Sequence, residues 1–364
     1  MDEPTVGDVG EFAVIRRLTG DRDGLINDLD GGARRGGPGP DASGTVGPGD
    51  DSAVIAAPDG RVVACTDMLV EGRHFRLDWS APSDVGHKAI AQNAADIAAM
   101  GAVCTGFLVS VGCPSSLAAG VLDEIAAGAR EEAAALGADV IGGDLVEAPG
   151  LVLSVTALGD MEGRTPVLRS GAREGDVVAI AGKLGASAAG LALLQSESQD
   201  GQDGRGTPRS AEAPHRPGAD PLQRLVDAHR RPAPPYAAGV AAAVAGASAM
   251  IDTSDGLVAD LGHIAAASGV VIDLDPGALS PGQLESAAGD DLREAGDAVG
   301  TDPWQWVLGG GEDHALVATY PDAGAVPRGW RVIGSVHPSG DGAAAVVVGG
   351  AAWRGAPGWV AFEG

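Results

Sequence analysis

The sequence predicts a two-domain protein of the α/β class, with strands and helices mixed in an α+β order. The chain has 364 residues, and a single hydrophobic core seldom grows past about 250–300 residues. β-rich runs that are closed by turn residues are interspersed with Ala-rich runs that stop at glycine, which is typical of strands and helices in one chain. We expect one domain over residues 1–163 and a second over residues 164–364.

In the first domain, the expected helices are bounded by small polar residues and glycines. Ser83 is a good N-cap for a helix to Met100, which Gly101 ends, and Gly137 ends an Ala-rich helix. The expected elements are a helix at 10–18, a flexible loop at 20–47, strands at 51–55 and 61–67, a helix at 83–100, a strand at 107–111, a helix at 116–136 and a strand at 151–158.

The second domain begins near Arg164 and contains a polar insertion. Residues 196–220 hold Gln, Asp, Gly, Ser, Pro and Arg with almost no apolar side chains, so we expect disorder there. The other expected elements are strands at 176–180, 249–252, 270–274, 315–319 and 330–336, helices at 185–194, from Leu222, at 236–245 and at 257–267, turns between the last strands, and a tail at 353–359.

Composition excludes several classes of partner. Fifty acidic residues against 24 basic ones give a formal charge of −26, and such a surface repels nucleic acid and anionic membranes. Aromatic residues make up 3% of the chain, too few for a platform that stacks single-stranded nucleic acid. An anionic substrate therefore needs bound metal or local Arg and Lys, and small aliphatic side chains must fill the core.

Cysteine usage and the N-terminus favour a reducing compartment. Cys65, Cys104 and Cys113 are too scattered for a disulfide framework or a zinc site. The first residues show neither a basic segment nor an apolar segment of a signal peptide, and no apolar run approaches the roughly 18 residues of a membrane helix. We expect a cytoplasmic protein.

Five segments place Asp beside glycine or small residues, at the end of an apolar run or in a glycine turn. They are Gly49-Asp50-Asp51, Thr66-Asp67, Asn93 to Asp96, Gly142-Gly143-Asp144 and Asp252 to Gly256. Converging carboxylates repel one another unless a divalent cation lies among them. Hard oxygen ligands without a His or Cys cluster suit Mg²⁺, which shares its coordination sphere with substrate phosphates.

Each of these segments has a simpler explanation when taken alone. Asp-Gly and Asp-Asp pairs are common turn chemistry. Asp96 lies on an apolar helix, three residues after Asn93 and therefore on one face with it, although a solvated helix face would also accommodate it. Only the ordered set favours a metal site.

Known phosphate-binding loops are absent from the sequence. Gly182-Lys183 lacks the spacing and the hydroxyl residue of a Walker A loop, and the catalytic-loop and Asp-Phe-Gly motifs of protein kinases are missing. Phosphate must be handled mainly by metal, glycine-rich backbone and a few bases such as Arg169. Phosphoryl transfer fits such a site because it requires positioning and charge neutralisation more than covalent chemistry.

Taken in order, the segments resemble the thiamine-monophosphate kinases, in the superfamily of aminoimidazole ribonucleotide synthetase and selenophosphate synthetase. They run from near the start to beyond residue 310. The matching segments are Gly10-Glu11-Phe12, Gly49-Asp50-Asp51, Thr66 to Gly72 with His74-Phe75, Ala95 to Ala102, Gly142-Gly143-Asp144, Arg169-Ser170-Gly171-Ala172, Ser254-Asp255-Gly256-Leu257 and Gly310-Gly311-Glu312-Asp313.

The resemblance implies an enzyme of thiamine biosynthesis that uses ATP and Mg²⁺ to convert thiamine monophosphate to thiamine diphosphate, by direct in-line transfer without a covalent enzyme intermediate. It also implies an aminoimidazole ribonucleotide synthetase-like fold, in which the N-terminal α/β domain, which binds ATP and Mg²⁺, pairs with its twin in a homodimer and a C-terminal α/β domain follows. By motif position, the implied Mg²⁺ ligands are Asp50, Thr66, Asp67, Asp96, Asp144, Asp252 and Asp255. The implied ATP contacts are Gly143, Asp144, Arg169 and Ser254, and the implied thiamine phosphate contacts are His74, Glu312 and Trp359.

The chain departs from the family pattern at a few positions. Cys65 stands where the family often has a hydroxyl residue, and Ala95 replaces a common Ser. His314-Ala315 replaces a usual Tyr-Glu, which affects the expected acceptor contacts. The 20–47 and 196–220 segments also look longer than is typical.

Alternatives remain at this point. Without the family pattern, His74, Trp359 and Glu312 would be explained as a structural histidine, a packing residue and a turn. Another synthetase or ligase of the superfamily would keep the ATP site and change the acceptor. A non-catalytic nucleotide-binding regulator would bind ATP without releasing ADP.

Overall fold

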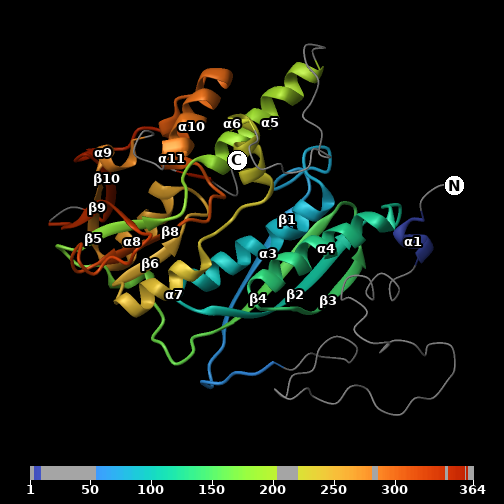
Figure 1. Cartoon of the computed structure of the whole chain (residues 1–364), viewed down its shortest axis with the longest axis horizontal. Helices are drawn as coiled ribbons and strands as arrows, with labels where there is room; N and C mark the ends of the chain where they lie inside the picture. Colours follow the sequence, from blue (N-terminus) through green and yellow to red (C-terminus); the bar gives the residue numbers. More distant parts are fainter. Residues whose placement is uncertain are drawn as a thin grey trace. The chain divides into compact units, whose positions relative to one another are not determined.

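The computed structural model describes residues 4–9, 55–202, 220–280, 286–340, 343–356 and 358–359. The predicted helix at 10–18, the loop at 20–47, Asp50 and nearly all of the strand at 51–55 lie outside these residues. The chain divides into two compact units, the first being Met1–Ile97 with Val103–Glu162 and the second Ala98–Ala102 with Gly163–Gly364 (Figure 1). Along the part that is described, no helix is both long enough and apolar enough to cross a membrane.

The first unit is a sheet with helices on one face. Its described elements are α1 Val6–Val9, β1 Val63–Val70, α3 Pro82–Ala99, β2 Val103–Cys113, α4 Ala119–Ala135, β3 Val140–Glu147 and β4 Val152–Asp160. The described strands pair in the order β1-β4-β2-β3, with β2 and β3 parallel and the other pairs antiparallel.

Period-two alternation explains which face of this sheet is buried. Leu69, Phe107, Leu153 and Val155 have no exposed surface, and strand pairing puts them on the face that α3 and α4 cover (Figure 1). The opposite face carries exposed apolar side chains such as Met68, which is 54% exposed.

Glycines let α3 and α4 approach closely. A Cβ built on Gly86 would lie 1.9 Å from Ile125 O, and one on Gly128 would lie 1.9 Å from Ser83 O. Both distances are shorter than any real contact, so the two helices meet backbone to backbone.

The second unit contains a larger sheet. Its described elements are η1 Arg169–Gly171, β5 Val177–Ala181, α5 Ala186–Gln202, α6 Pro221–Arg230, α7 Tyr236–Ala245, β6 Ala249–Asp252, α8 Leu257–Ser268, β7 Val270–Leu274, α9 Pro276–Leu279, α10 Ser286–Val299, α11 Pro303–Gly309, β8 Leu316–Tyr320, β9 Arg331–Pro338, β10 Ala345–Val348 and β11 Ala351–Ala352. The described strands follow the order β11-β10-β7-β9-β5-β8-β6.

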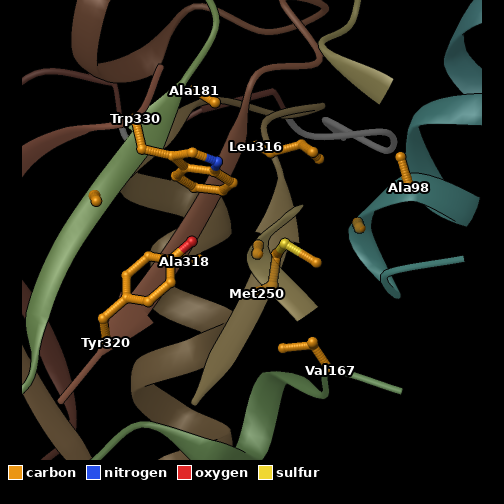
Figure 2. Close-up of a cluster of buried hydrophobic side chains, with 11 residues drawn as sticks. Ala98, Val167, Ala181, Met250, Leu316, Ala318, Tyr320 and Trp330 are labelled. Atoms are coloured by element: carbon orange, nitrogen blue, oxygen red, sulfur yellow. The ribbon is translucent and has the colours of Figure 1, made fainter. Parts of the chain in front are cut away.

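Small side chains fill one core cluster of this unit, as the composition predicts. Alanines make up most of the cluster, and two aromatic rings supply bulk (Figure 2). Tyr320 on β8 and Trp330 meet edge to face, with ring centroids 5.8 Å apart. Such a pair packs well because the positive ring edge faces the negative ring face.

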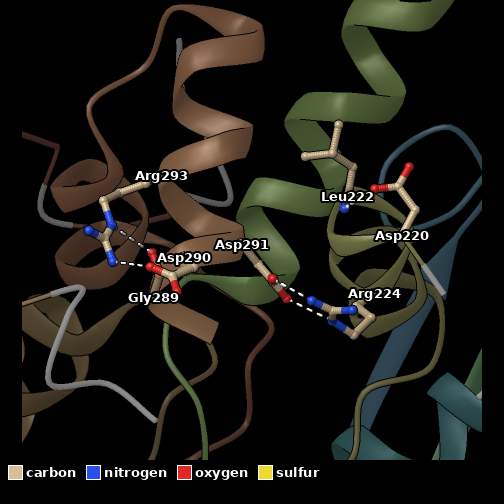
Figure 3. Close-up of polar contacts among 7 residues, drawn as sticks. All are labelled: Asp220, Leu222, Arg224, Gly289, Asp290, Asp291 and Arg293. Carbon is tan, nitrogen blue, oxygen red and sulfur yellow. Dashed lines mark hydrogen bonds and ion pairs between the residues drawn. The ribbon is translucent and has the colours of Figure 1, made fainter. Parts of the chain in front are cut away.

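Two sequence predictions are wrong, the N-cap at Ser83 and part of the disorder over 196–220. Ser83 is not the N-cap of α3, because the helix begins at Pro82 and the amides of Asp84 and Val85 donate to Ala81 O. Proline suits this first position, since the missing N–H would be unsatisfied there. The disorder expected over 196–220 is contradicted at 196–202, which continue α5, and at Asp220, which caps α6 through Leu222 N (Figure 3). Residues 203–219 lie outside the description.

Three helices after residue 274 were not predicted from the sequence. Turns and strands were expected there, whereas α9 occupies 276–279 and α10 and α11 occupy much of 286–309. Asp302 accepts a hydrogen bond from Trp304 N at 3.1 Å, with Pro303 in the first turn. An Asp-Pro pair of this kind is a recognised start signal and could have revealed α11.

Candidate functional site

Asp67 and Asp96 lie on facing sides of β1 and α3. Asp67 points from β1 toward the helix, and its backbone N–H donates to Asn93 Oδ1 at 3.0 Å. Asn93 is fully buried, and its Nδ2 donates to Ala89 O at 2.9 Å, which fixes the amide. Asn93 therefore joins the strand and the helix that carry the two carboxylates, a role that the sequence analysis did not assign.

Cys65 lies between these carboxylates. Its Sγ donates to Asn93 O at 3.3 Å. Burial raises the pKa of the Cys65 thiol, and the nearby Asp96 and Asp67 raise it further. Burial also raises the pKa of Cys104 to about 12. A thiol with a raised pKa is a poor metal ligand, because the thiolate is the ligand form.

Thr66 and Asp144 lie on the other face of the same sheet. The Thr66 hydroxyl donates to Val155 O at 2.9 Å. Asp144 is paired with Ser110, which is in turn paired with Ser154, on the exposed face. With strands about 4.8 Å apart, three spacings separate β3 from β1 by about 14 Å. The first unit thus does not bring these two side chains to Asp67 and Asp96.

The expectation that Asp67 and Asp144 end apolar runs or lie in a glycine turn is wrong. Both lie inside strands, since β1 continues to Val70 and β3 to Glu147. Gly143 is required in β3 for a steric reason, because a Cβ there would lie 1.9 Å from Val109 O. Asp252, by contrast, is the last residue of β6.

His74 lies in the turn after β1 and is held from two directions. Its Nδ1 accepts a hydrogen bond from Val70 N at 2.9 Å, so the neutral ring carries its proton on Nε2. The carbonyl oxygen of His74 accepts from Lys88 Nζ at 3.0 Å. Lys88 is 2% exposed. It places a buried cation beneath this turn, and a lysine within the apolar stretch of α3 is a signal that the sequence analysis did not use.

In the second unit, Asp252 to Gly256 form a tight turn between β6 and α8. The Asp260 Oδ2 atom accepts from Asp255 N at 3.1 Å and from Gly256 N at 2.9 Å. Burial, followed by the charge of Asp252, raises the pKa of Asp260 to about 7. Gly256 has φ +128°, and a Cβ there would lie 2.9 Å from Gly309, so only glycine fits this position.

Asp252 and Asp255 are close enough to influence each other. Burial raises the pKa of Asp255, His263 opposes this, and the negative charge of Asp252 adds to it. Asp252 is 3% exposed. Its Oδ2 atom lies 3.1 Å from His314 Nδ1. His314 thus contacts a predicted metal ligand, at a position where the family pattern has a different residue.

The segment from Glu312 to His314 connects three parts of the second unit. Glu312 Oε2 lies 3.4 Å from His229 Nδ1 on α6. Asp313 accepts from Gly185 N at 2.5 Å and Ser187 N at 2.9 Å, at the start of α5. Burial raises the pKa of Asp313 to about 7, against the lowering effect of these bonds. Glu312 and His314 adopt φ of +63° and +50°, which these contacts hold in place.

Glu312 and Trp359 both contact the turn that carries Ser254 and Asp255. Glu312 N donates to Ser254 O at 2.8 Å, and Trp359 N donates to Asp255 O at 2.9 Å. Trp359 is 51% exposed. With Asp252, which is close to Asp255, the second unit therefore brings five predicted site residues together.

Arg169 is not among them. Its carbonyl oxygen accepts from Ser268 Oγ at 3.0 Å, at the C-terminal end of α8. Ser254 precedes the N-terminal end of the same helix, which has 12 residues. At 1.5 Å per residue, α8 is about 18 Å long, so Arg169 and Ser254 lie at opposite ends of this length.

The donor chemistry of the two carboxylate pairs fits Mg²⁺. Among the residues that the structure describes, no three His, Cys, Asp or Glu side chains could hold a metal ion on their own. The pairs Asp67 with Asp96 and Asp252 with Asp255 are hard oxygen donors. Mg²⁺ keeps several waters and is usually bound by one or two carboxylates plus substrate phosphates. Each pair therefore suits Mg²⁺ that is bound together with water and substrate phosphates.

The chain is similar to known proteins in sequence and in fold. Residues 49–161 match the family model "AIR synthase related protein, N-terminal domain". The chain is 49% identical over 361 residues to a thiamine-monophosphate kinase of Mycobacterium tuberculosis. This alignment covers 99% of this chain and 94% of that protein. A thiamine-monophosphate kinase of Corynebacterium glutamicum is 41% identical over 338 residues, which make up 92% of this chain and 88% of that protein. The solved structure "AaThiL complexed with AMPPCP and TMP" has a TM-score of 0.70 at 30% identity, and the match covers 86% of this chain and 91% of that one.

The fold and the matched N-terminal segment define the class, which is that of the AIR synthase-related proteins. Within this class, the chain belongs to the thiamine-monophosphate kinase family. It is an enzyme, a phosphotransferase with a phosphate group as acceptor. The family and the fold class predicted from the sequence are confirmed.

Proposed function

We propose that the protein transfers the γ-phosphoryl group of ATP to thiamine monophosphate in one in-line displacement that requires Mg²⁺. An oxygen of the acceptor phosphate attacks the γ-phosphorus, the bond from that phosphorus to the β–γ bridging oxygen breaks, and ADP leaves. Thiamine diphosphate and ADP are the products. The similarity to thiamine-monophosphate kinases over nearly the whole chain and the complex of AaThiL with AMPPCP and TMP support this reaction.

Each carboxylate pair would supply metal ligands within its own unit. These are Asp67 and Asp96 in the first unit and Asp252 and Asp255 in the second, and Asp50 is added by its place in the family motif. When bound, Mg²⁺ supplies charge neutralisation for the phosphates. Thr66 and Asp144 stay in the proposed ligand set on the resemblance alone, because their side chains lie on the exposed face of the sheet.

The protein's own groups would position both substrates. The single observation that carries this assignment is that Glu312 and Trp359 each donate a backbone hydrogen bond to the Ser254–Asp255 turn. This adjacency puts proposed acceptor contacts beside proposed metal ligands. The Glu312 carboxylate would face the cationic thiazolium ring, and Trp359 would offer a ring face to it.

The other proposed contacts rest more on the family pattern. His74 would present its Nε2–H to the acceptor phosphate, since its Nδ1 already accepts from Val70 N. Gly143 and Asp144, with Ser254, would contact the nucleotide. Arg169 is included on the resemblance alone, because its backbone lies a helix length from Ser254.

We also propose that the exposed sheet face of the first unit pairs with a second copy of the chain. Met68 and Val146 are 54% and 59% exposed there, and large apolar side chains on one face favour association. Sedimentation of the full chain should give the dimer mass, and Met68→Lys should shift it to the monomer. A wild-type chain that sediments as a monomer at micromolar concentration would refute the pairing.

We place the enzyme in the cytoplasm, where ATP is available and thiols stay reduced. The free state of Cys65, Cys104 and Cys113 agrees with this compartment. Cell fractionation with an antibody to the chain would test the assignment.

The reaction is tested with the purified chain, ATP, Mg²⁺ and thiamine monophosphate. ADP and thiamine diphosphate should form in equal amounts, EDTA should stop the reaction, and ATP chiral at its γ-phosphorus should transfer with inversion. Asp96→Asn and Asp255→Asn should each lower kcat/KM by at least about 10–100-fold, the cost of disturbing even outer-shell groups of metal sites.

Asp290→Asn is the matched control, because Asp290 is a 73% exposed aspartate outside the proposed ligand set. It should leave kcat/KM unchanged. Full activity of both site variants would refute the metal assignment, and retention of configuration would refute direct transfer.

A further inference from the structure

His229 is a buried histidine that contacts a residue of the proposed acceptor site. It lies in the last turn of α6 and is 4% exposed. Its Nδ1 atom is 3.1 Å from Ser187 Oγ and 3.4 Å from Glu312 Oε2. The ring nitrogen thus lies between a hydroxyl on α5 and the Glu312 carboxylate.

The backbone around Glu312 is fixed, but only side-chain contacts can fix its carboxylate. Glu312 N donates to Ser254 O at 2.8 Å, and the following Asp313 accepts from two amides at the start of α5. Glu312 itself has φ +63°. A glutamate side chain has several rotamers of similar energy, and ordering it on binding costs entropy.

Ser187 is equally well fixed. It is fully buried, and its backbone N–H donates to Asp313 Oδ1 at 2.9 Å. Its hydroxyl therefore meets His229 from a rigid helix start. The contacts from Ser187 to His229 to Glu312 run from the start of α5, through the end of α6, to the loop after α11.

We propose that His229, held by Ser187, is a positioning residue that orients the Glu312 carboxylate for the cationic ring of the thiamine acceptor. The inference rests on the proposed function, because it takes Glu312 as an acceptor contact. The side chain of Glu312 is 27% exposed, so it is held on the His229 side and still reaches solvent. A carboxylate oriented before binding loses less entropy when the acceptor arrives.

A positioning role predicts a specific kinetic effect. Glu312 would bind the acceptor in the ground state and the transition state alike, so loss of its orientation should raise KM for thiamine monophosphate and leave kcat nearly unchanged. KM for ATP should not change. A merely structural role for His229 would lower stability and the amount of active enzyme without this selective change.

The experiment compares two replacements of His229 in the full-length enzyme. His229→Leu removes the polar atom at similar volume, and we expect KM for thiamine monophosphate to rise about tenfold, equivalent to about 1.4 kcal/mol. His229→Asn retains an N–H donor near the position of Nδ1, and it should bring KM back to within about threefold of wild type, roughly 0.6 kcal/mol.

His87→Leu is the matched control. His87 is also a buried histidine, with Nδ1 3.0 Å from Glu132 Oε2 between α3 and α4. It should lower thermal stability as His229→Leu does, without a change in KM for thiamine monophosphate. If His229→Leu does not fold, Ser187→Ala provides the same kinetic test, with a smaller rise in KM.

Glu312→Gln separates the inference from the function on which it rests. If Glu312→Gln leaves KM for thiamine monophosphate unchanged, Glu312 is not an acceptor contact, and the inference is overturned together with that assignment. If Glu312→Gln raises KM and His229→Leu behaves like His87→Leu, only the inference is overturned. The double variant should be no worse than Glu312→Gln alone, because both changes remove one interaction, and additive effects would overturn the inference.

Discussion

Replacing Arg224 by methionine should remove a two-point ion pair between α6 and α10 (Figure 3). Arg224 Nε donates to Asp291 Oδ2 at 2.9 Å, and Nη2 donates to Oδ1 at 2.5 Å. The side chain of Asp291 is 7% exposed and that of Arg224 is 43% exposed. Methionine retains much of the apolar stem of arginine, so the change removes mainly the charge and the two hydrogen bonds.

We expect the free energy of unfolding to fall by about 2 kcal/mol. A hydrogen bond to a charged group contributes about 1.5–3 kcal/mol, and stripping the partner from a fully buried ion costs about 3–5 kcal/mol. Because the Arg224 side chain is 43% exposed, water screens the pair and the effect lies toward the low end. For a domain of about 150–250 residues, 2 kcal/mol corresponds to a fall in Tm of about 4–8 °C.

Arg293→Met is the matched control on α10. Arg293 forms an ion pair with Asp290, and the two side chains are 55% and 73% exposed (Figure 3). Either variant changes the formal net charge from −26 by one, to −27, so the general charge effect is the same. The control should lose under about 0.5 kcal/mol, as exposed pairs do.

Scanning calorimetry would measure Tm, and hydrogen exchange would show whether the amides of α6 and α10 lose protection. A double-mutant cycle of Arg224→Met with Asp291→Asn should give a coupling energy of about 1–2 kcal/mol. Equal Tm values for Arg224→Met and Arg293→Met, or a coupling energy near zero, would refute the reasoning.

Three further predictions concern packing and ionisation. Gly86→Ala should lower the free energy of unfolding by about 1–3 kcal/mol or more, because its Cβ would lie 1.9 Å from Ile125 O. Gly262→Ala on α8, whose Cβ would have nothing within 4 Å, should raise the free energy of unfolding by up to about 1 kcal/mol. Equal melting curves for the two variants would contradict this. Tyr320→Phe should leave the free energy of unfolding unchanged or higher, because the described structure gives the buried Tyr320 hydroxyl no hydrogen-bond partner (Figure 2), and a fall in Tm would show that the hydroxyl is bonded. Burial raises the pKa of Asp313 from 3.8 to about 7, so the neutral carboxyl is favoured on folding, and its contribution to stability is fully present below about pH 4 and lost as pH rises through about 7. Raising the pH from 5 to 8 should therefore lower the Tm of the wild type relative to that of Asp313→Asn. A Tm difference that stays constant over this range would count against the shifted pKa.

Local patterns predicted several elements to the residue. α7 at Tyr236–Ala245, β6 at Ala249–Asp252 and β7 at Val270–Leu274 have the predicted bounds. Each is a short, mostly apolar run that stops at or just before glycine or an acidic residue, and these residues disfavour continuation of the element. Gly246 indeed ends α7 with φ +81°.

Other features depend on contacts between distant segments and were missed or wrong. Helix α10 carries several charged residues and a glycine, and it is stabilised by packing on α5, α6 and α11. The helical state of residues 196–202 likewise extends a helix whose start is capped by Asp313, more than a hundred residues away. Sequence periodicity carries no information about such partners.

The candidate site divides in the same way. Asp252, Asp255 and Glu312 were predicted from their place in a family pattern, and the tertiary structure shows them next to one another. Asn93, Lys88 and His229 were assigned no role in the site, because a single polar residue in an apolar helix has no distinctive local signal. Their contacts became visible only when β1, the His74 turn and the Glu312 loop were packed against those helices.

The sequence by itself determined the family and the mixed α/β class, since these depend on which residues follow one another. Only the tertiary structure decided that Asp144 and Thr66 lie on the exposed face of the sheet, away from Asp67 and Asp96. The physical reason is the two-residue period of a strand. A shift of one position turns a side chain to the opposite face, and the register that selects the face depends on pairing between strands that are far apart in the chain.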